Sequence, residues 1–351
     1  MSLTDAQLAL RKTTLGASEV AAACGLSPYR RPIEVWARKV GLAPPEDAAT
    51  LRRFRLGHAM EEAVAGEYAE LCGMNGASLD HLAVSDDVWP NGTDGTVLHP
   101  DHPWCSATPD RVVRHRLLND DGSPRFVWET VRLVELKTAT GFSADGWEGY
   151  EGADGFYVGA VPVDYEAQAI WQMFVTGVHA CDLAVLINGS DFRAYHIPWD
   201  ADLAAALFAR ASRFWTEYVQ TGIAPPRDGS DAWASVYADL HRKSFTRPSL
   251  LDASEEYVAL ARRYVELTAM EKAADAEKTA IKQQFMEIIA GDLGMENRAE
   301  GVKVSWRFDE KGRTAWAEVA KALNPPEELI ARHTTPPGRT FTVSAKTRRG
   351  G

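Results

Sequence analysis

The sequence lacks several patterns that define whole classes of protein. No apolar run is long enough to cross a bilayer, and the N-terminus has no basic-then-apolar secretory segment, so we expect a soluble, cytoplasmic protein without a membrane partner. The 4 cysteines form no CxxC pair, which argues against zinc and iron–sulfur sites and favours reduced, buried thiols. Neither a Gly-x-x-x-x-Gly-Lys-Ser/Thr loop nor a Gly-x-Ser-x-Gly segment occurs, so ATP hydrolysis and serine-hydrolase chemistry are not expected.

Positive charge is also in short supply. The chain carries 38 Lys and Arg against 49 Asp and Glu, a formal net charge of -11. Because phosphate binding depends on clustered Lys and Arg, this balance argues against a protein that coats DNA. It is compatible with a carboxylate-rich site whose charge is cancelled by bound metal ions, beside a local basic groove.

The first part of the chain is predicted to alternate between helices and short strands. We expect helix and turn up to about residue 41, with Ser18 as a helix N-cap, and a long amphipathic helix over 51–71. Antiparallel strands are expected between 81 and 135. Their turns are predicted at Asn91-Gly92, Asp94-Gly95 and Asp121-Gly122.

The next part predicts the rest of a sheet. A glycine- and aromatic-rich segment (141–159) is expected to be a flexible loop over a site, with Trp147, Tyr150 and Tyr157 free to stack on bases. After it we expect a helix (165–175), two strands (183–187 and 192–197) that meet at Asn188-Gly189, and a helix (201–220). Together these elements predict an α/β fold with a central mixed sheet flanked by helices.

Three regions are expected along the chain: a core (1–222), a linker (223–251) around Pro225-Pro226, and a helical extension with a short β segment and a basic tail (252–351). The extension begins with a charged helix over 254–289, which could be a helical arm, an oligomerisation element, or a helix packed on its own domain. The basic tail could contact DNA or be a plain solvated end. Its basic residues are Arg332, Arg339, Lys346, Arg348 and Arg349.

The residues most suggestive of chemistry are Asp110, which follows a strand (104–108), and the Glu135-Leu136-Lys137 segment at the end of a buried strand (126–136). Side chains alternate along a strand, so Glu135 and Lys137 share one face while Leu136 enters the core. Two charges at a buried strand end are costly without a metal ion or a counter-charge. The alternative is a cross-strand ion pair at a sheet edge.

These residues suit metal-assisted hydrolysis of a phosphodiester. Such a reaction needs a divalent cation that neutralises phosphate oxygens and lowers the pKa of a water. Magnesium is typically held by one or two carboxylates, with water and substrate completing its shell. Asp110 and Glu135 could supply the carboxylates, and Leu136 a main-chain carbonyl, with manganese as a substitute metal.

Several segments occur in an order that closely resembles the phage lambda exonuclease and YqaJ-type viral recombinase family, within the PD-(D/E)XK nuclease superfamily. They span about 11–197. The segments are Arg11 with Leu15-Gly16-Ala17-Ser18-Glu19-Val20, Gly57-His58-Ala59-Met60-Glu61, Ser106-Ala107-Thr108-Pro109-Asp110, Val134-Glu135-Leu136-Lys137-Thr138 and Tyr165-Glu166-Ala167-Gln168.

The resemblance implies a restriction-endonuclease-like core and a role for each matched residue. Asp110 and Glu135 would hold the metal, Lys137 would orient the attacking water or stabilise the transition state, and Glu61 would assist from its helix, with Glu62 as the alternative. Gln168 matches a glutamine beside the active site, whereas the second glutamine of the family's Gln-x-Gln pattern is replaced by Ile170.

The resemblance also implies how the protein would meet its substrate. Arg11 and Ser18 would grip the 5′ phosphate end of DNA, and Arg30 and Arg31 could complete that pocket. The expected activity is magnesium-dependent 5′ to 3′ digestion of one strand of linear duplex DNA, which leaves single-stranded DNA for recombination. Expected partners are duplex ends, a single-strand annealing protein and further copies of the chain in a ring-shaped trimer. If the protein is phage-encoded, its location would be a bacterial host's cytoplasm.

Two other functions compete with this one. A related endonuclease or repair nuclease would share the site but not the end-gripping pocket. A non-catalytic DNA-binding or assembly protein would use the carboxylates structurally. His99 and His102 could bind a metal, but without further spaced ligands they are predicted to be surface histidines.

Overall fold

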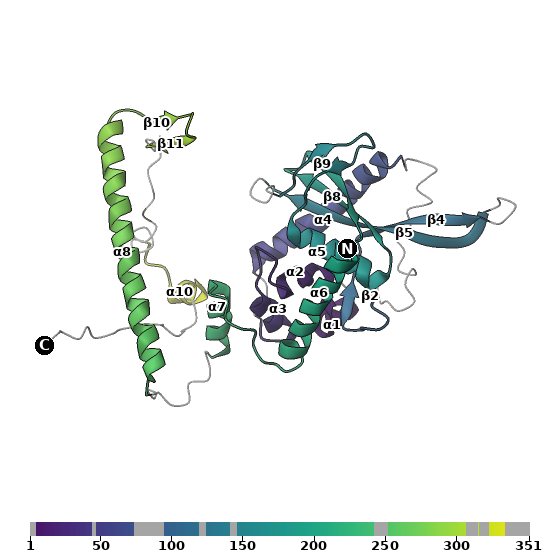
Figure 1. Ribbon diagram of the computed structural model, residues 1–351, viewed down its shortest axis with the longest axis horizontal. Helices are drawn as coiled ribbons and strands as arrows, with labels where there is room; N and C mark the ends of the chain where they lie inside the picture. The colour runs from purple at the N-terminus through teal and green to yellow at the C-terminus, as the bar shows by residue number, and fades with distance from the viewer. Residues whose placement is uncertain are drawn as a thin grey trace. The chain divides into compact units, whose positions relative to one another are not determined.

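A mixed four-stranded sheet in the order β4-β5-β8-β9 forms the centre of the first unit, Met1–Leu240, of the computed structural model (Figure 1). β5 (Pro124–Ala139) pairs antiparallel with β4 (Arg111–Leu118) and parallel with β8 (Ala180–Ile187), and β8 pairs antiparallel with β9 (Asp191–Pro198). This confirms the predicted mixed sheet. The structure describes residues 5–43, 47–73, 95–118, 124–140, 146–241, 252–306, 315 and 323–333.

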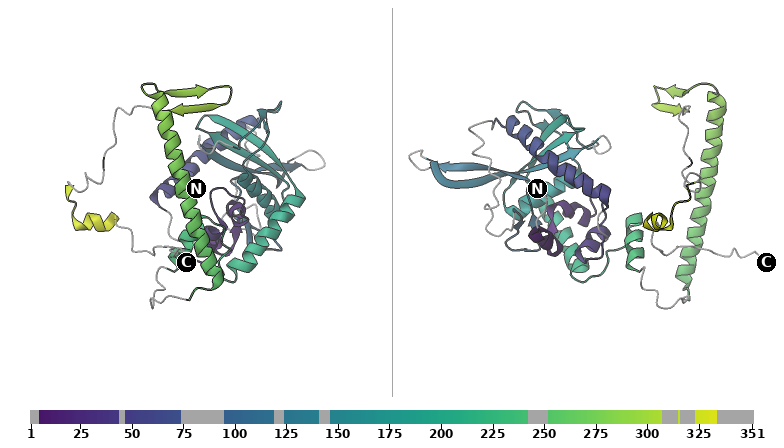
Figure 2. Two further views of the ribbon diagram at one scale, coloured as in Figure 1. Left: turned by 60° about the vertical axis from the view of Figure 1, so that its left-hand side comes forward. Right: turned by 180° about the vertical axis from the view of Figure 1, so that it is seen from behind.

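Helices cover both faces of this sheet. α4 (Ala48–Leu71) contacts β5, β8 and β9 on one face, while α5 (Val163–Thr176) contacts the same three strands on the other (Figure 2). α2 (Ala17–Ala23) packs on α5 and brings the N-terminal segment to the α5 face. Burial of β-branched and aliphatic side chains on both faces explains why β8 is apolar along most of its length.

A small second sheet ties the N-terminus to the segment that precedes β4. β1 (Leu15–Gly16) pairs parallel with β3 (Cys105–Ala107), and β3 pairs antiparallel with β2 (Val97–Leu98). The indole of Trp171 on α5 donates to the carbonyl of Ser106 at 3.2 Å. The connection that leads into Asp110 is therefore held between α5 and the N-terminal strand.

Several local predictions concern ends and turns. The helices over 51–71 and 165–175 are confirmed, and so is the turn at Asn188-Gly189, where both residues have positive φ. Ser18 is not a helix cap: α2 begins at Ala17, and Glu19 accepts a hydrogen bond from the Gly16 N–H at 3.2 Å instead. The turn pairs Asn91-Gly92 and Asp121-Gly122, and Asp94 of the third pair, lie outside the described residues.

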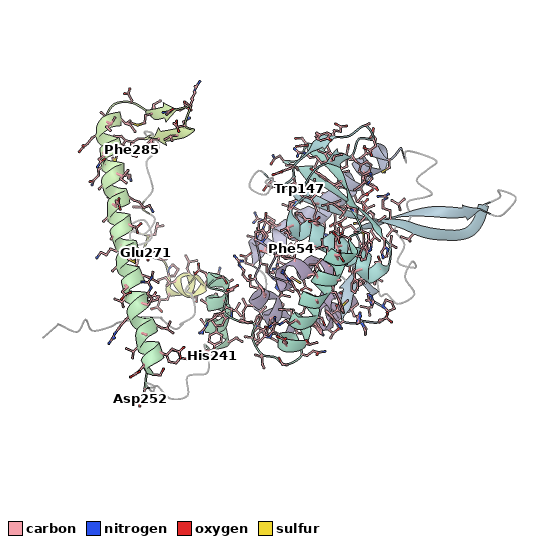
Figure 3. All side chains as sticks on the ribbon, viewed as in Figure 1. Phe54, Trp147, His241, Asp252, Glu271 and Phe285 are labelled. Atoms are coloured by element: carbon pink, nitrogen blue, oxygen red, sulfur yellow. The ribbon has the colours of Figure 1, made fainter. Side chains whose placement is uncertain are left out.

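The described part of the segment predicted as a flexible loop is folded. It contains the hairpin formed by β6 (Tyr150–Glu151) and β7 (Tyr157–Val158). Trp147 (Figure 3) is buried and stacks on Tyr165 with ring centroids 5.4 Å apart, so it is not free to stack on bases. Tyr157 lies under the Arg193 guanidinium, whereas Tyr150 is exposed.

A polar cluster lies on the α4 face of the sheet. Asp182 on β8 is 1% exposed and accepts from the Tyr68 hydroxyl at 2.7 Å and from the Arg132 guanidinium at 2.5 Å. Its carboxylate is also 2.8 Å from Nδ1 of His196, whose ring stacks on Phe156 of the hairpin. This network compensates a buried charge and anchors the hairpin to β9.

Most of the remaining helices of the first unit lie before β1 or after β9 in the sequence. α6 (Ala201–Phe214) continues as a π-helical turn over Trp215–Val219, and the predicted linker contains α7 (Asp231–Leu240), which packs on α3 (Pro32–Lys39). The indole of Trp233 donates to the carbonyl of Pro225 at 3.1 Å and fixes the Pro-Pro segment to α7. α1 (Asp5–Thr13) precedes β1 at the N-terminus.

The second unit, His241–Gly351, contains the predicted long helix, α8 (Glu255–Ile289). It is followed by an antiparallel hairpin of β10 (Gly294–Asn297) and β11 (Val302–Ser305), and by α10 (Glu327–His333). Most of the basic tail lies outside the described residues, and Arg332 on α10 is exposed. Among the helices that the structure describes, none is both long and apolar enough to span a membrane.

Candidate functional site

The site lies at the point where the pairing of β4 with β5 ends. Arg111, the first residue of β4, pairs with Val134, and the β5 residues beyond it pair only with β8. The carboxylate of Asp110 continues the ladder by one step, because its Oδ2 accepts from the Leu136 N–H at 2.8 Å. The N–H and C=O of a strand residue point to the same edge, so the Leu136 carbonyl is directed to the side where Asp110 lies.

Glu135 lies on the α5 face and is held from two elements. The side chain is buried, and its Oε1 accepts from the amide of Gln168 and from the ammonium of Lys137. Its Oε2 accepts from Nε2 of Gln172 at 2.6 Å. Three donors therefore fix both oxygens of a carboxylate that would otherwise be costly to bury.

Lys137 completes the charged centre. It lies two residues along β5 from Glu135, on the same face as the alternation of a strand predicts, and its ammonium is 5.3 Å from the centroid of the Tyr165 ring. Burial lowers the pKa of Lys137, but the carboxylates of Glu135 and Asp110 outweigh it and raise the pKa above its ordinary value. Lys137 is therefore a fixed positive charge at neutral pH.

At Asp110 the surroundings favour the uncharged form of the side chain. Burial, and then the Glu135 carboxylate, raise the pKa of Asp110 to about 8, against the lowering effects of Lys137 and the Leu136 N–H. A buried carboxyl whose ionisation is opposed by a neighbouring carboxylate is a favourable place for a cation. Of the described residues, no group of three or more His, Cys, Asp and Glu could hold a metal ion, so any cation here would rely on two carboxylates and a carbonyl.

The helix carboxylates differ in what they face. Glu61 on α4 is close enough to Asp110 to raise its pKa further, and its Oε1 is 2.6 Å from Nδ1 of His58. Glu62 pairs with the guanidinium of Arg111 and has a side chain that is 84% exposed. The geometry therefore favours Glu61 over Glu62 as the residue that acts on the site.

Of the residues predicted to grip a DNA end, Arg11 is held through its main chain by a lysine whose side chain is buried. The ammonium of Lys39 donates to the Arg11 carbonyl and to Oε2 of Glu19, both at 2.5 Å. This contact fixes the end of α1, which carries the exposed Arg11 side chain, beside α2, where Ser18 is also exposed. Arg30 is half-buried in the loop between α2 and α3. Their role at a DNA end stays a prediction.

Gln172 is the residue that the sequence prediction missed. The expected Gln-x-Gln spacing led to Ile170, which is buried in the core. Gln172 lies four residues after Gln168, so both amides project from the same face of α5 toward Glu135. The helical period of the Gln168-x-x-x-Gln172 pair could have identified it.

Residues 7–179 match a known protein family, described as the YqaJ-like viral recombinase domain. This segment is a YqaJ-like viral recombinase domain. The matched residues include Asp110, Glu135, Lys137 and Gln168, together with the N-terminal segment from Arg11. The resemblance stated from the sequence motifs is thereby confirmed for this part of the chain.

Individual relatives of this chain are distant. The YqaJ protein of Bacillus subtilis (strain 168), described as uncharacterized, is 24% identical over 304 residues, which cover 84% of this chain and 76% of that protein. The alkaline exonuclease LHK-Exo of Laribacter hongkongensis is 19% identical, with 63% of this chain and 94% of that chain covered and a TM-score of 0.40. A structure of LHK-Exo with dAMP is 18% identical over the same shares, again with a TM-score of 0.40.

Proposed function

We propose that this recombinase domain protein is a magnesium-dependent DNA exonuclease that digests one strand of linear duplex DNA from its 5′ end. The observation that carries the proposal is the convergence of Asp110, Glu135 and Lys137 at the strand end where β4 leaves β5. The single strand that remains would serve recombination through a single-strand annealing partner. We place this activity in the cytoplasm of a bacterial host.

The donor set at the site suits magnesium. The carboxylates of Asp110 and Glu135 and the carbonyl of Leu136 are hard oxygen ligands, and a partly protein-made shell is usual for this ion. When bound there, magnesium would neutralise phosphate oxygens and lower the pKa of a water, and manganese would substitute for it. The raised pKa of Asp110 is a second sign that the site favours a nearby cation.

The chain's own residues supply orientation and charge. Gln168 and Gln172 hold the Glu135 carboxylate in one orientation, so that it can accept a hydrogen bond from the attacking water. The Lys137 ammonium, anchored between Glu135 and the Tyr165 ring, is placed to donate to the water or to a phosphate oxygen as negative charge develops. Arg11, Ser18 and Arg30 would bind the 5′ phosphate and set the direction of digestion.

The test uses the full chain and two DNA substrates, a linear duplex with 5′ phosphates and a covalently closed circle. With magnesium, we expect loss of one strand of the linear duplex and an intact circle, and chelator should stop the digestion. Nicking of the circle would favour the endonuclease alternative, especially if Arg11→Ala lowered only end-dependent digestion. A folded protein that binds duplex DNA but degrades neither substrate would favour the non-catalytic alternative.

Gln172 is expected to act as a positioning residue for Glu135. Gln172→Met keeps the volume of the side chain but removes the donor to Oε2, and substitutions in such outer contacts commonly cost about 10- to 100-fold in activity. The turnover rate on linear DNA should fall by that factor with little change in KM or melting temperature. Gln220→Met, at an exposed position, is the matched control. An unchanged turnover rate in Gln172→Met would show that Glu135 needs only Gln168 and Lys137.

A further inference from the structure

The longest helix of the protein leaves its apolar side chains in solvent. α8 spans Glu255–Ile289 (Figure 1), about 52 Å at 1.5 Å per residue. Ile289 is the only buried residue of this helix. Besides Met270, six large apolar side chains of α8 are between 44% and 69% exposed, which is unusual for one helix of a stable protein. They are Tyr257, Leu260, Tyr264, Leu267, Ile281 and Ile288.

These residues follow the spacing of a coiled-coil seam. From Tyr257 to Ile288, steps of three and four residues alternate without interruption and also pass through Phe285. A sustained seven-residue repeat keeps one stripe facing a partner helix when two helices supercoil. The stripe is interrupted by charge only at Glu271 and Lys278, with Ala274 between them.

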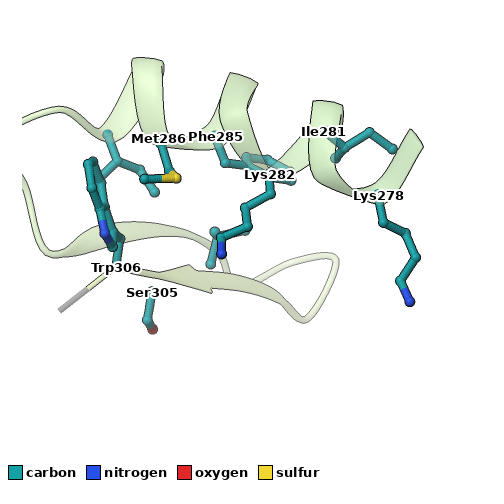
Figure 4. Close-up of a pocket in the computed structure, with 9 residues that line it drawn as sticks. Lys278, Ile281, Lys282, Phe285, Met286, Ser305 and Trp306 are labelled. Carbon is teal, nitrogen blue, oxygen red and sulfur yellow. The ribbon is translucent and has the colours of Figure 1, made fainter. Parts of the chain in front are cut away.

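The chain's own hairpin lies against the C-terminal part of the stripe and leaves the rest of it uncovered. Ile281, Phe285 and Met286 line a groove of about 270 Å³ together with Ser305 and Trp306, and Lys278, Lys282, Ile289 and Val304 complete its lining (Figure 4). The hairpin follows the last turns of α8, so it does not account for the stripe between Tyr257 and Leu267. Ile281 is still 44% exposed although it lines this groove, and Ile288, which does not line it, is 69% exposed.

Glu271 and Lys278 favour one orientation of a partner helix over the other. In a parallel, in-register pair, Glu271 would meet Glu271 and Lys278 would meet Lys278 inside the seam, and like charges there are destabilising. In an antiparallel pair centred between residues 272 and 273, Glu271 meets Ala274 and lies one layer, about 6 Å along the axis, from Lys278 of the other copy. The same register places Tyr257 opposite Ile288 and Tyr264 opposite Ile281.

We infer that α8 is a self-association element that pairs antiparallel with α8 of a second copy of this chain. The register joins apolar positions at both ends of the helix and brings Glu271 within one layer of Lys278, which itself lies opposite Leu267, so a second copy accommodates both features of the stripe. The residues of this interface belong to the second unit of the chain, whereas the site on β5 belongs to the first. Loss of pairing should therefore leave digestion of DNA unchanged.

Light scattering on the purified full chain tests the pairing. Leu260→Glu combined with Leu267→Glu should halve the mass of the assembly, whether the remaining unit is a monomer or a ring. Ala269→Glu combined with Ala276→Glu adds the same charge on another face of α8 and should leave the mass unchanged. A monomeric wild-type protein, or a mass unaffected by the first double variant at unchanged helicity, would overturn the inference.

Cross-linking tests the orientation without disturbing the fold, because Tyr257 and Ile288 are both exposed. When Tyr257→Cys and Ile288→Cys chains are mixed and oxidised, we expect disulfide-linked pairs that join one chain of each kind. Wild-type protein, with its free native cysteines, is the blank. Cross-linking of each variant only with itself would indicate a parallel pair and contradict the proposed geometry.

Discussion

Lys137→Ala is expected to lower the turnover rate on linear duplex DNA by about 100- to 1000-fold, the usual cost of removing one group that stabilises transition-state charge. Lys137 donates to Glu135, and its pKa is raised by Glu135 and Asp110, so it stays charged throughout the neutral range. No other cation of the described site contacts the Glu135 carboxylate. Single-turnover digestion with magnesium, beside DNA binding measured in chelator, separates the chemical step from binding.

The matched control for this variant is Lys303→Ala, which removes a lysine from the exposed hairpin of the second unit. Its turnover rate should equal that of the wild-type protein. Lys137→Arg keeps the charge but not the size of the ammonium, so partial activity is expected from it. If folded Lys137→Ala digested DNA at the wild-type rate, Lys137 would be a structural partner of Glu135 rather than part of the chemistry.

Asp110→Asn is expected to separate stability from activity. Asparagine can still accept the hydrogen bond from the Leu136 N–H, but it no longer places a negative charge beside Glu135. Without divalent cations, the variant should therefore be more stable than the wild-type protein at pH 9, by roughly a few kcal/mol. Digestion should be lost, because a ligand for the cation is missing.

The pH dependence follows from the direction of the Asp110 shift. The pKa rises from 3.8 in the unfolded chain to about 8 in the folded one, so the folded protein binds this proton more tightly. The corresponding stability is fully present below pH 3.8 and is lost as the pH rises through about 8. Melting temperatures between pH 4 and 9 should fall more steeply for the wild-type protein than for Asp110→Asn.

Magnesium should reverse the order of stability of the wild-type protein and Asp110→Asn. A cation that binds the folded state stabilises it, so the melting temperature of the wild-type protein should rise with magnesium and that of Asp110→Asn should rise much less. Calorimetric titration of both proteins with magnesium alone checks the same point without DNA. Equal magnesium binding by the two proteins would remove Asp110 from the proposed ligand set.

The sequence was most informative where a short-range rule governs the structure. Alternation along β5 placed Glu135 and Lys137 on one face and Leu136 in the core, and the apolar period located α4, α5 and α8. The order of motifs identified the recombinase domain. Such rules depend on neighbours a few residues apart, which a single sequence contains in full.

Features that depend on distant contacts were not predictable in the same way. Trp147 lies in a glycine-rich segment that was predicted to be a flexible loop, yet burial against Tyr165 and Tyr195 fixes its side chain. Ser18 has a good capping side chain, but pairing of β1 with β3 sets the start of α2 two residues earlier than a cap at Ser18 would, with Gly16 at the N-cap position. The network around Asp182 joins residues more than a hundred positions apart, as in the bond from Tyr68, and no local pattern indicates it.

Asp110 extends the hydrogen-bond ladder between β4 and β5 by one residue, and this constrains the number of residues that can connect β3 to β4. Only Thr108 and Pro109 separate β3 from Asp110, and Arg111 is already paired with Val134. An insertion or deletion between β3 and β4 would break the hydrogen bond between the Asp110 carboxylate and the Leu136 N–H, even if every other residue were retained. In distant homologues, an uninterrupted alignment across 107–111 is therefore a sharper sign of retained chemistry than overall identity.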